Sequence, residues 1–507
     1  MVERTLIVTA VPLAYLVVAL GIGLWSRGKA DQNTTEGYIA GDRNVSLVVL
    51  YFIMGASILS AFAFLGGPGA AYSDGGEAYY VLAYTGTGML LWYLLGPKAI
   101  RLGRKYGYVT QAEMVSDRYD SKWLSVLMAL ASIGAFIPYT VLQITGVGLI
   151  LETASDGLIP YWLAALLPFL VITVYVLSSG MMGVGWSNVL QGAMMLVFAW
   201  SIGLYLPFEL YGGVGPMFEG INAELANHLV IGGTADGMSV LQYSSYVLVS
   251  TLGFVMWPHL FMRAYTSRDV KTLKKTVMLY PLFGLVLVPI LFIGFSGIRY
   301  AEVANPDNIL PYMLTTLEMN PWIIGFFFAG GLAAAMSSAD SIVHAAASVF
   351  TRDFYTKVIE PDAPDRRATR ITQLAVVAVV AVSYYFAVVS SVGIVDLLAG
   401  AYGAVIQFLP LVLGAIYWEQ ATREGAITAL LAGSAVTVYY TFFAASPLLV
   451  HAGFWGLCVT TVVFVAVSLF TEVDDPKRVR EFIEATRPQG EAVEKERSAG
   501  EAVPADD

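Results

Sequence analysis

The 507-residue sequence contains a single cysteine, Cys458, and only four histidines. One cysteine cannot form an intrachain disulfide, a paired-cysteine metal site or an iron–sulfur cluster. No His-Glu-x-x-His motif and no Walker-type glycine loop occurs, which argues against a metalloprotease and against an ATP-driven pump. These absences remove several metal-dependent and nucleotide-dependent functions.

Charged residues are also scarce. They make up 13% of the chain, whereas soluble domains carry about 25%. Hydrophobic residues make up 57%, and the mean hydropathy is +0.68. The composition therefore indicates an integral membrane protein. The formal net charge of −10 does not favour nucleic-acid binding, so we expect no nucleic-acid partner.

Thirteen apolar runs are long enough to span a bilayer. They lie at about 5–25, 46–71, 79–100, 122–151, 159–178, 186–208, 240–262, 276–298, 320–350, 369–389, 393–418, 424–444 and 449–471. The first run resembles a signal peptide in position, but its apolar part is too long and no small-residue cleavage site precedes Arg27. The sequence thus predicts an all-α membrane protein with about 13 transmembrane helices and no separate soluble domain.

The distribution of Lys and Arg predicts the orientation, because cytoplasmic loops are enriched in these residues. With the N-terminus outside, only Arg4 and Arg299 lie in outer segments, so 26 of the 28 basic residues face inside. We therefore expect a multi-pass cell-membrane protein with a cytoplasmic C-terminus. We also expect short surface helices in the acidic outer segments 209–237 and 299–320, and disorder past about Arg487.

The ninth run continues into the stretch 329–355, which carries polar side chains at membrane depth. On a helix, one face collects Ser337, Ser341, His344 and Ser348, with Asp340 beside them. A carboxylate at mid-bilayer costs roughly 2.5–3.5 kcal/mol, so such residues usually line an ion site or a pathway. The alternative is that the hydroxyls bond back to their own helix carbonyls and serve only as packing surface.

Two other spans contain residues that interrupt helices. In the second span, small and hydroxyl residues lie at 54–61 and Gly66-Gly-Pro-Gly follows; the seventh has a weak point at 250–254, before Trp257-Pro258. Freed carbonyls suit Na+, and half-helix N-termini suit an anionic group. Because these spans are five apart, they match two inverted five-helix repeats, each opening with a broken helix. An ordinary kink or a close helix crossing is the alternative.

Two amides also lie at membrane depth, Gln143 in the fourth span and Gln407 in the eleventh. We expect each to bond to a neighbouring helix, and contact with a solute is the alternative. Together with residues at the two breaks, they form a candidate solute-binding set: Ser57, Ser60, Gln143, Ser250, Thr251, Phe254 and Gln407.

Four motifs, in order along the chain, resemble those of the sodium:solute symporter family. This family includes the bacterial proline, pantothenate and monocarboxylate symporters and the sodium–sugar cotransporters. The motifs are Gly66-Gly-Pro-Gly-Ala70, Pro258-His-Leu-Phe-Met-Arg263, Ala334-Ala-Met-Ser-Ser338 and the stretch from Gln407 to Ala426. They resemble the end of core helix one, the inner end of core helix six, core helix eight, and core helix ten with its following loop.

The resemblance implies a LeuT-like 5+5 inverted-repeat core with one extra N-terminal and two extra C-terminal helices. It divides the chain into an N-terminal helix with its inner loop (1–45), a ten-helix transport core (46–418) and two C-terminal helices (419–471). The core comprises repeats 46–208 and 240–418. An acidic, partly disordered cytoplasmic tail follows at 472–507.

The resemblance also implies a conserved Na+ site made of three backbone carbonyls and two hydroxyls. Its residues are Ala56, Leu59, Ala334, Ser337 and Ser338. The family often has Trp-Thr-Asp where this chain has Trp186-Ser187-Asn188, which puts the family's ion-exit route in doubt. We expect Asp340 to supply part of the missing negative charge, and Asn188, Asp340 and His344 are the ion-pathway candidates.

The implied function is secondary active transport rather than enzyme catalysis: Na+-coupled symport of a small organic solute by alternating access. We favour an organic anion, such as a monocarboxylate or pantothenate, because the stretch 257–265 looks closer to those subfamilies. Proline symporters carry an aspartate where this chain has Ile58, which argues against a plain proline transporter. The expected partners are the solute, the co-transported Na+ and the lipid bilayer, and no obligatory protein partner is inferred.

Several alternatives remain open. One is symport of proline or another amino acid with Na+. Another is a proton-coupled transporter of the same fold, with Asp340 or His344 as the proton carrier. A membrane enzyme would need a convergent nucleophile–base pair, and the spacing of Ser341 and His344 fits a solvated stripe better. A transport-like sensor would need an appended signalling domain, for which the tail is too short.

Overall fold

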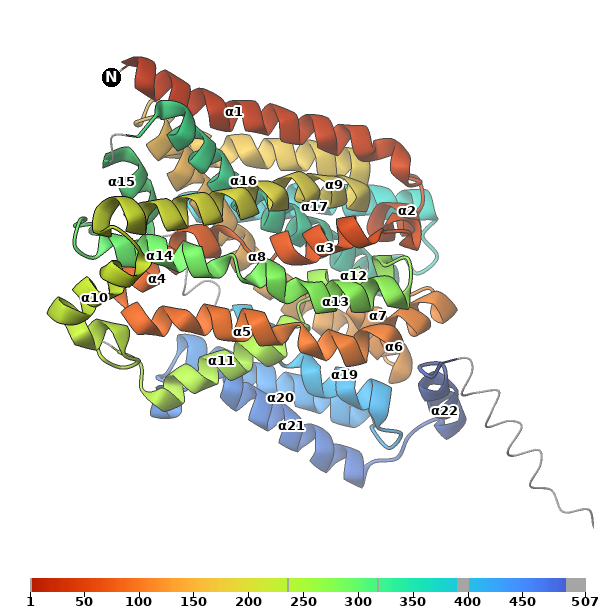
Figure 1. Cartoon of the computed structure of the whole chain (residues 1–507). Helices are drawn as coiled ribbons and strands as arrows, with labels where there is room; N and C mark the ends of the chain where they lie inside the picture. Colours follow the sequence, from red (N-terminus) through yellow and green to blue (C-terminus); the bar gives the residue numbers. More distant parts are fainter. Residues whose placement is uncertain (1, 235–236, 317–318, 390–400, 489–507) are drawn as a thin grey trace, which may run out of the picture.

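The structure is a computed structural model that describes residues 2–234, 237–316, 319–389 and 401–488 (Figure 1). These residues form helices joined by short connections, and their β-structure is one isolated parallel bridge between Val45 and Ser267. The expected disorder past Arg487 falls on 489–507, outside the described residues. The all-α class expected from the sequence is confirmed for the described part of the chain.

The helices have the following bounds. The first eleven are α1 Val2–Trp25, α2 Thr35–Ala40, α3 Leu47–Ala56, α4 Gly67–Ser73, α5 Tyr80–Gly88, α6 Leu90–Tyr106, α7 Gln111–Arg118, α8 Lys122–Ala154, α9 Tyr161–Tyr211, α10 Val214–Leu225 and α11 Val240–Phe254. The others are α12 Pro258–Thr266, α13 Val270–Gly284, α14 Leu287–Gly297, α15 Ile309–Thr316, α16 Pro321–Val349, α17 Asp365–Val389, α19 Phe408–Tyr417, α20 Arg423–Phe442, α21 Ala452–Phe470 and α22 Pro476–Glu484.

Nine helical segments among the described residues are long and apolar enough to cross a bilayer. They are Glu3–Lys29, Lys122–Ala154, Tyr161–Tyr211, Val240–Thr266, Val270–Gly297, Pro321–Ile359, Asp365–Val389, Arg423–Phe442 and Ala452–Phe470. The expected second and third spans are each divided into shorter helices, α3 with α4 and α5 with α6. The expected run at 393–418 lies partly outside the described residues. The count of thirteen spans therefore stays a prediction.

α9 contains two of the expected spans. Its 51 residues would extend about 76 Å as a straight helix, far more than the ~30 Å hydrocarbon core of a bilayer. The helix is interrupted at Gly180, whose φ of 47° and ψ of −134° are not helical, and Figure 1 shows the two halves as separate rods. A Cβ atom at Gly180 would lie 2.4 Å from the carbonyl oxygen of Tyr38, so glycine is required at this turn.

α16 lies inside the bundle, against α1, α8, α9 and α17. Its glycines allow this close packing: a Cβ atom at Gly330 would lie 1.9 Å from the ring of Phe198, and one at Gly331 would lie 2.9 Å from Ile150. Small residues let neighbouring helices approach closely in membranes. The polar stretch identified in the sequence is consequently enclosed by protein rather than exposed to lipid, and every residue from Ala333 to Ser348 is buried.

Both predicted helix breaks are confirmed. α3 ends at Ala56, and the chain resumes a helical path in a π-helical segment, Phe62–Gly66, that leads into α4. α11 ends at Phe254, and α12 starts at Pro258, where proline suits the first turn because its missing N–H is not needed. Both breaks place non-helical backbone in the buried interior of the bundle.

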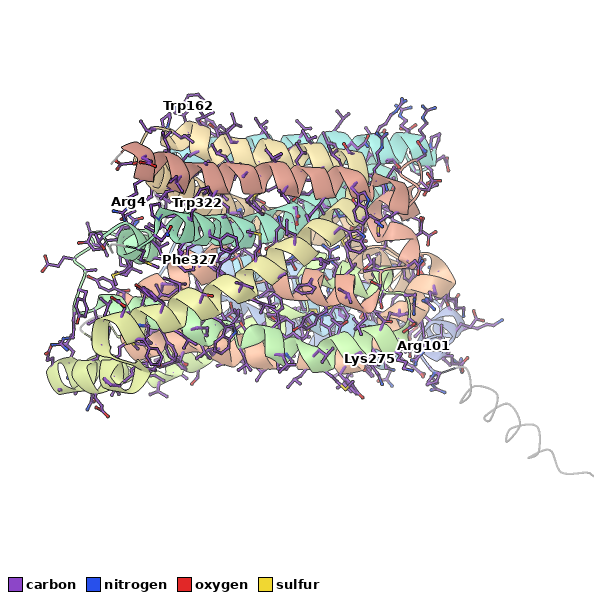
Figure 2. The ribbon with its side chains drawn as sticks, turned by 45° about the horizontal axis from the view of Figure 1, so that its top comes forward. Arg4, Arg101, Trp162, Lys275, Trp322 and Phe327 are labelled. Carbon is purple, nitrogen blue, oxygen red and sulfur yellow. The ribbon has the colours of Figure 1, made fainter. Side chains whose placement is uncertain are left out.

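The ends of the bundle differ in their side chains. Arg101 of α6 and Lys275 of α13 lie toward one end, whereas Arg4 of α1 and Trp322 of α16 lie toward the opposite end (Figure 2).

The acidic segments contain the expected short helices, α10 and α15. α10 is largely exposed, but the expectation of a surface helix is wrong for α15, because five of its eight residues are buried.

The tail also contains an ordered helix, α22. Its Arg478 forms ion pairs with Asp117 at 2.6 Å and with Asp120 at 2.7 Å, both at the end of α7. Val479 and Phe482 of α22 are buried. The part of the tail that the structure describes is therefore packed against the bundle.

Candidate functional site

The break after α3 frees backbone carbonyls from the helical hydrogen-bond ladder. α3 ends at Ala56, and the amide of Ala61 donates a 2.9 Å hydrogen bond to the side-chain oxygen of Gln143 on α8. Gln143 therefore bonds to a neighbouring segment, as expected, and supports the far end of the break. Backbone carbonyls without helical partners are tolerated at membrane depth only beside protein or a wet cavity.

Two hydroxyls of α16 lie against this break. Ser337 Oγ donates to the carbonyl oxygens of Ala56 at 2.9 Å and Ala334 at 2.8 Å. Ser338 Oγ donates to the carbonyl oxygen of Ser57 at 2.9 Å. All five residues are fully buried. Four residues of the expected Na+ site are thus brought together from two segments, and Ser337 and Ala56 are 281 positions apart in the chain.

The chemistry of this group fits a small hard cation. Such cations prefer oxygen ligands, and the group offers carbonyl and hydroxyl oxygens from one broken and one intact helix. Leu59, the remaining expected ligand, is buried in the same break. If a cation binds, each hydroxyl group can rotate so that its oxygen faces the ion. The carbonyl oxygens then contact the ion in place of the hydroxyl hydrogen atoms.

A buried carboxylate next to these serines in sequence is bonded to α9. Asp340 accepts hydrogen bonds from Tyr175 Oη at 2.6 Å, Ser187 Oγ at 2.9 Å and Asn188 Nδ2 at 3.0 Å. Ser341 Oγ donates a fourth, at 3.3 Å. Because an ionised carboxylate only accepts hydrogen bonds, four donors suit the charged form. The carboxylate of Asp340 therefore lies directly against Asn188.

Two further polar residues of α16, His344 and Ser348, lie one and two turns beyond Asp340. His344 Nε2 lies 3.1 Å from the carbonyl oxygen of Tyr38 on α2, and the two rings are 5.7 Å apart. Ser348 Oγ donates a 2.7 Å hydrogen bond to the carbonyl of His344, four residues earlier. The hydroxyl of Ser348 thus bonds back to a carbonyl of its own helix, which was the alternative to a pathway role. His344 instead joins α16 to α2.

Five aromatic residues form a cluster between the two breaks. Ring centroids are 5.0 Å apart for Tyr139 and Trp257, 5.3 Å for Trp257 and Tyr402, 5.8 Å for Tyr84 and Tyr402, and 6.2 Å for Tyr84 and Phe254. All five are almost completely buried. These five residues are the aromatic cluster. They come from α5, α8, the end of α11 with the break that follows it, and the chain just before α19.

The aromatic cluster adjoins the oxygens on α16. The hydroxyl of Tyr139 lies beside the side chains of Ser60 and Ser338. Sequence reasoning had identified only Phe254 among the five. Two signals were available: Tyr139 is one helical turn before Gln143, and Trp257 directly precedes the proline that opens α12.

Two members of the candidate solute-binding set lie elsewhere. Gln407 donates to Thr437 Oγ1 at 3.1 Å and accepts from Thr460 Oγ1 at 2.6 Å, which joins it to α20 and α21. Gln407 thus bonds to neighbouring helices, as expected. Thr251 Oγ1 lies 3.0 Å from Thr87 Oγ1 on α5, in a partly exposed position. These contacts are structural links between helices.

The hydroxyls at the breaks have mixed surroundings. Ser57 Oγ bonds back to the carbonyl of Ile53 at 2.5 Å, and Ser60 Oγ accepts from the amide of Phe62 at 3.2 Å. Ser250 is buried on α11. Of these hydroxyls, Ser60 is placed beside Tyr139 of the aromatic cluster.

The sequence did not reveal that the side chains of His259 and Arg263 on α12 are buried. Arg263 and His259 are 0% and 1% exposed. Nε and Nη2 of Arg263 and both ring nitrogens of His259 have no hydrogen-bond partner among the described residues. Arg263 was counted from the sequence as an inner-loop residue, and the structure instead encloses it within the bundle.

Comparison with known proteins gives relatives that cover almost the whole chain. An uncharacterized symporter of Bacillus subtilis (strain 168), YhjB, is 32% identical over 470 residues, covering 90% of this chain and 95% of its own. The sodium/pantothenate symporter of Escherichia coli (strain K12) is 26% identical over 434 residues, covering 83% and 88%.

Solved structures give the same fold. A Na+-coupled sialic acid symporter in a substrate-bound, outward-open state aligns with a TM-score of 0.77 at 20% sequence identity, covering 92% of this chain and 98% of that structure. This neighbour and the all-helical architecture confirm the expected LeuT-like fold class. The model of the sodium:solute symporter family matches residues 38–433. The chain therefore belongs to the sodium:solute symporter family, whose members are secondary transporters rather than enzymes.

Proposed function

We propose that this protein carries a small organic anion across the cell membrane together with Na+, by alternating access. The contacts of Ser337 and Ser338 with the broken segment after α3 are the observation that carries the proposal. One Na+ held by the residues of the expected site would join α16 to this break. Solute binding beside the same break would then depend on the ion.

Coupling follows from this shared segment. If Na+ orders the break and the solute contacts it, each ligand increases the affinity for the other by the same factor. A membrane potential of ~100 mV contributes about 2.3 kcal/mol for each positive charge moved inward. The Na+ concentration gradient adds to this driving force.

Asp340 supports the ion indirectly in this proposal. Its carboxylate contacts Asn188 and Ser187 of α9, where the family often has an acidic residue. The negative charge is thereby kept in the region even though Asn188 is neutral. We place Asp340 near the cation without direct coordination, because the carbonyl and hydroxyl oxygens already form a plausible shell.

We place the solute against the aromatic cluster. Its rings and hydroxyls include no carboxylate, so they do not repel an anion. The N-terminus of α12 follows directly after Trp257 and carries a partial positive charge. Apolar walls with a few polar groups are typical of sites for small organic molecules. A short monocarboxylate, or a larger acid such as pantothenate, meets these conditions.

Uptake into vesicles tests the function. With the purified chain reconstituted and Na+ outside, we expect accumulation of a labelled monocarboxylate or pantothenate several-fold above that with K+ outside. A panel of organic acids and amino acids identifies the solute class. Uptake that ignores Na+ at fixed pH contradicts sodium coupling, and uptake restricted to amino acids contradicts the choice of an anion.

The proposed orientation has the N-terminus outside and the C-terminus in the cytoplasm. Arg101 and Lys275 at one end of the bundle, opposite Arg4, are consistent with this arrangement (Figure 2). Single cysteines at the exposed positions Glu219 and Glu484, in a Cys458→Ala background, should react with impermeant thiol reagents from outside and inside, respectively. Labelling of position 219 from inside alone would reverse the orientation.

A further inference from the structure

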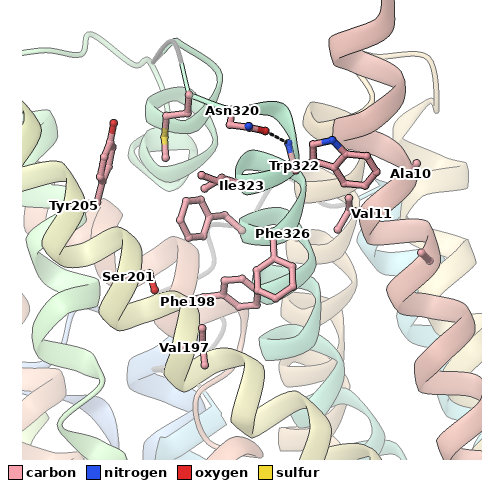
Figure 3. Close-up of a pocket in the computed structure, with 13 residues that line it drawn as sticks. Ala10, Val11, Val197, Phe198, Ser201, Tyr205, Asn320, Trp322, Ile323 and Phe326 are labelled. Carbon is pink, nitrogen blue, oxygen red and sulfur yellow. Dashed lines mark hydrogen bonds between the residues drawn. The ribbon is translucent and has the colours of Figure 1, made fainter.

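A long groove on the surface of the bundle lies apart from the proposed transport site. It has a volume of about 1050 Å³ and runs along the first turns of α16, between α1 and α9. Figure 3 shows Trp322, Ile323 and Phe326 of α16 extending into it. Phe198 lies at its inner side, with its ring centroid 4.4 Å from that of Phe326.

The lining of the groove is almost entirely apolar. The large hydrophobic residues in it include exposed ones: Trp322 is 62%, Val197 is 56% and Phe326 is 46% exposed. Ala10 and Ala14, one turn apart on α1, widen the groove on that side. Ser201, Tyr205 and Asn320 are the polar residues of its lining. The groove thus opens on the outer surface of α1, α9 and α16, three helices that are long and apolar enough to span a bilayer.

Physical chemistry restricts what can fill this space. Water needs two to four polar partners. The lining offers the hydroxyls of Ser201 and Tyr205 beside Asn320, whose side-chain oxygen already accepts from the amide of Trp322 at 3.0 Å, so most of the groove offers water no partner. A second transmembrane helix packs best where small residues allow backbones to approach, but Trp322, Ile323 and Phe326 hold a helix away from α16. A hydrocarbon chain is slender, apolar and abundant in the bilayer. Its atoms would make van der Waals contacts with lining residues that have no such partners when the groove is empty.

We propose that a bilayer phospholipid inserts an acyl chain into this groove and acts as a bound lipid. The proposal depends on the chain spanning a membrane and does not depend on the identity of the solute. In the proposed orientation the lipid comes from the outer leaflet. Its chain lies against Phe198 and Phe326, between α1 and α9.

The bound chain is connected to the candidate Na+ site by a short path of contacts. Phe198 packs against Gly330, where a Cβ atom would lie 1.9 Å from the ring. Gly330 is one helical turn before Ala334, whose carbonyl oxygen is 2.8 Å from Ser337 Oγ. The lipid therefore supports the same pair of helices that presents the oxygens of the site.

Photolabelling tests the lipid site. The full chain is reconstituted in nanodiscs with phosphatidylcholine that carries a diazirine near the end of one acyl chain, then irradiated and digested. We expect labelled peptides covering 197–205 and 319–327 to exceed those of α17 several-fold. α17 is the reference because its Leu374 and Val377 are 66% and 45% exposed outside the groove.

Matched tryptophan variants sharpen the result. Ser201→Trp fills the groove and should lower its labelling several-fold, whereas Leu374→Trp adds the same side chain to α17 and should leave it unchanged. If Ser201→Trp is not recovered in folded form, Ala14→Phe fills the groove from α1. Equal labelling of the groove and α17 would show ordinary annular lipid only. Cross-linked dimers with an unlabelled groove would show that a second copy covers it. Either result overturns the proposal.

Discussion

Replacing Ser338 with alanine should raise the Na+ concentration for half-maximal uptake roughly ten- to a hundredfold. The substitution removes one oxygen from the proposed ion shell and leaves the surrounding helix intact. A hydrogen-bonding group that faces a charge contributes about 1.5–3 kcal/mol, and each 1.4 kcal/mol corresponds to a factor of ten in affinity. Uptake of the labelled solute at a series of Na+ concentrations measures the effect.

Ser348→Ala is the matched control for this experiment. It makes the same chemical change on the continuous helix α16, but the hydroxyl of Ser348 bonds only to the carbonyl of His344, at 2.7 Å. This hydroxyl bonds only within its own helix. We therefore expect the Na+ concentration for half-maximal uptake of the variant to stay within about a factor of two of that of the parent protein. Unchanged Na+ dependence in a normally inserted Ser338→Ala protein would remove Ser338 from the ion site.

Asp340→Asn should weaken Na+ binding by a comparable factor. A carboxylate within about 8 Å of a cation contributes about 2 kcal/mol at an effective dielectric constant near 20, which is roughly thirtyfold in affinity. The substitution also presents an amide N–H₂ group to Tyr175, Ser187 and Asn188, which donate to the carboxylate. We expect both a lower Na+ affinity and a lower thermal stability of the purified protein.

A charge exchange distinguishes these two effects. The double variant Asp340→Asn with Asn188→Asp returns the carboxylate to the interface between α9 and α16 from the opposite side. The two side chains already approach to 3.0 Å, so the exchanged pair can form the same hydrogen bond with donor and acceptor reversed. Na+ affinity should recover most of its loss in the double variant, whereas Asn188→Asp alone should not restore a parent-like profile because two carboxylates then face each other.

The same variants test proton coupling. If Asp340 carries a proton instead of supporting Na+, Asp340→Asn would leave solute exchange intact and abolish uptake driven by a pH gradient. Na+ titrations of the parent protein would then show no dependence at fixed pH. A parent protein whose uptake ignores Na+, together with an Asp340→Asn variant that loses uptake driven by a pH gradient, would contradict the sodium assignment.

The parts of the site that local sequence determines were predictable. Glycine, proline and small hydroxyl residues mark both breaks, because they weaken a helix wherever they occur. Asp340 was identifiable as a residue that needs partners, because a lone carboxylate in an apolar run is costly. The resemblance to a family added that Ser337 and Ser338 face the break at Ala56 and Leu59; that Ser338 bonds to the carbonyl of Ser57 came from the structure.

The parts that depend on tertiary packing were not predictable. Tyr175 lies 165 positions before its partner Asp340, and nothing in the apolar pattern around it differs from an ordinary lipid-facing tyrosine. The aromatic cluster likewise comes from four separate segments. The turn at Gly180 depends on close approach to the backbone of Tyr38, a contact that sequence spacing does not encode. The periodicity of hydrophobic residues predicts which face of a helix is buried, but not which residues of other segments pack against that face.

The unsatisfied side chains of α12 affect the energetics of the transport cycle. Each buried polar group that lacks a hydrogen bond raises the free energy of its conformation by about 1–3 kcal/mol. Among the described residues, Nε and Nη2 of Arg263 and both ring nitrogens of His259 have no hydrogen-bond partner. Water that reaches α12 in another conformation would hydrate these atoms and recover part of this free energy. The described arrangement is thereby kept from becoming a deep minimum, and a small difference in free energy between two conformations lets one bound ion shift their populations.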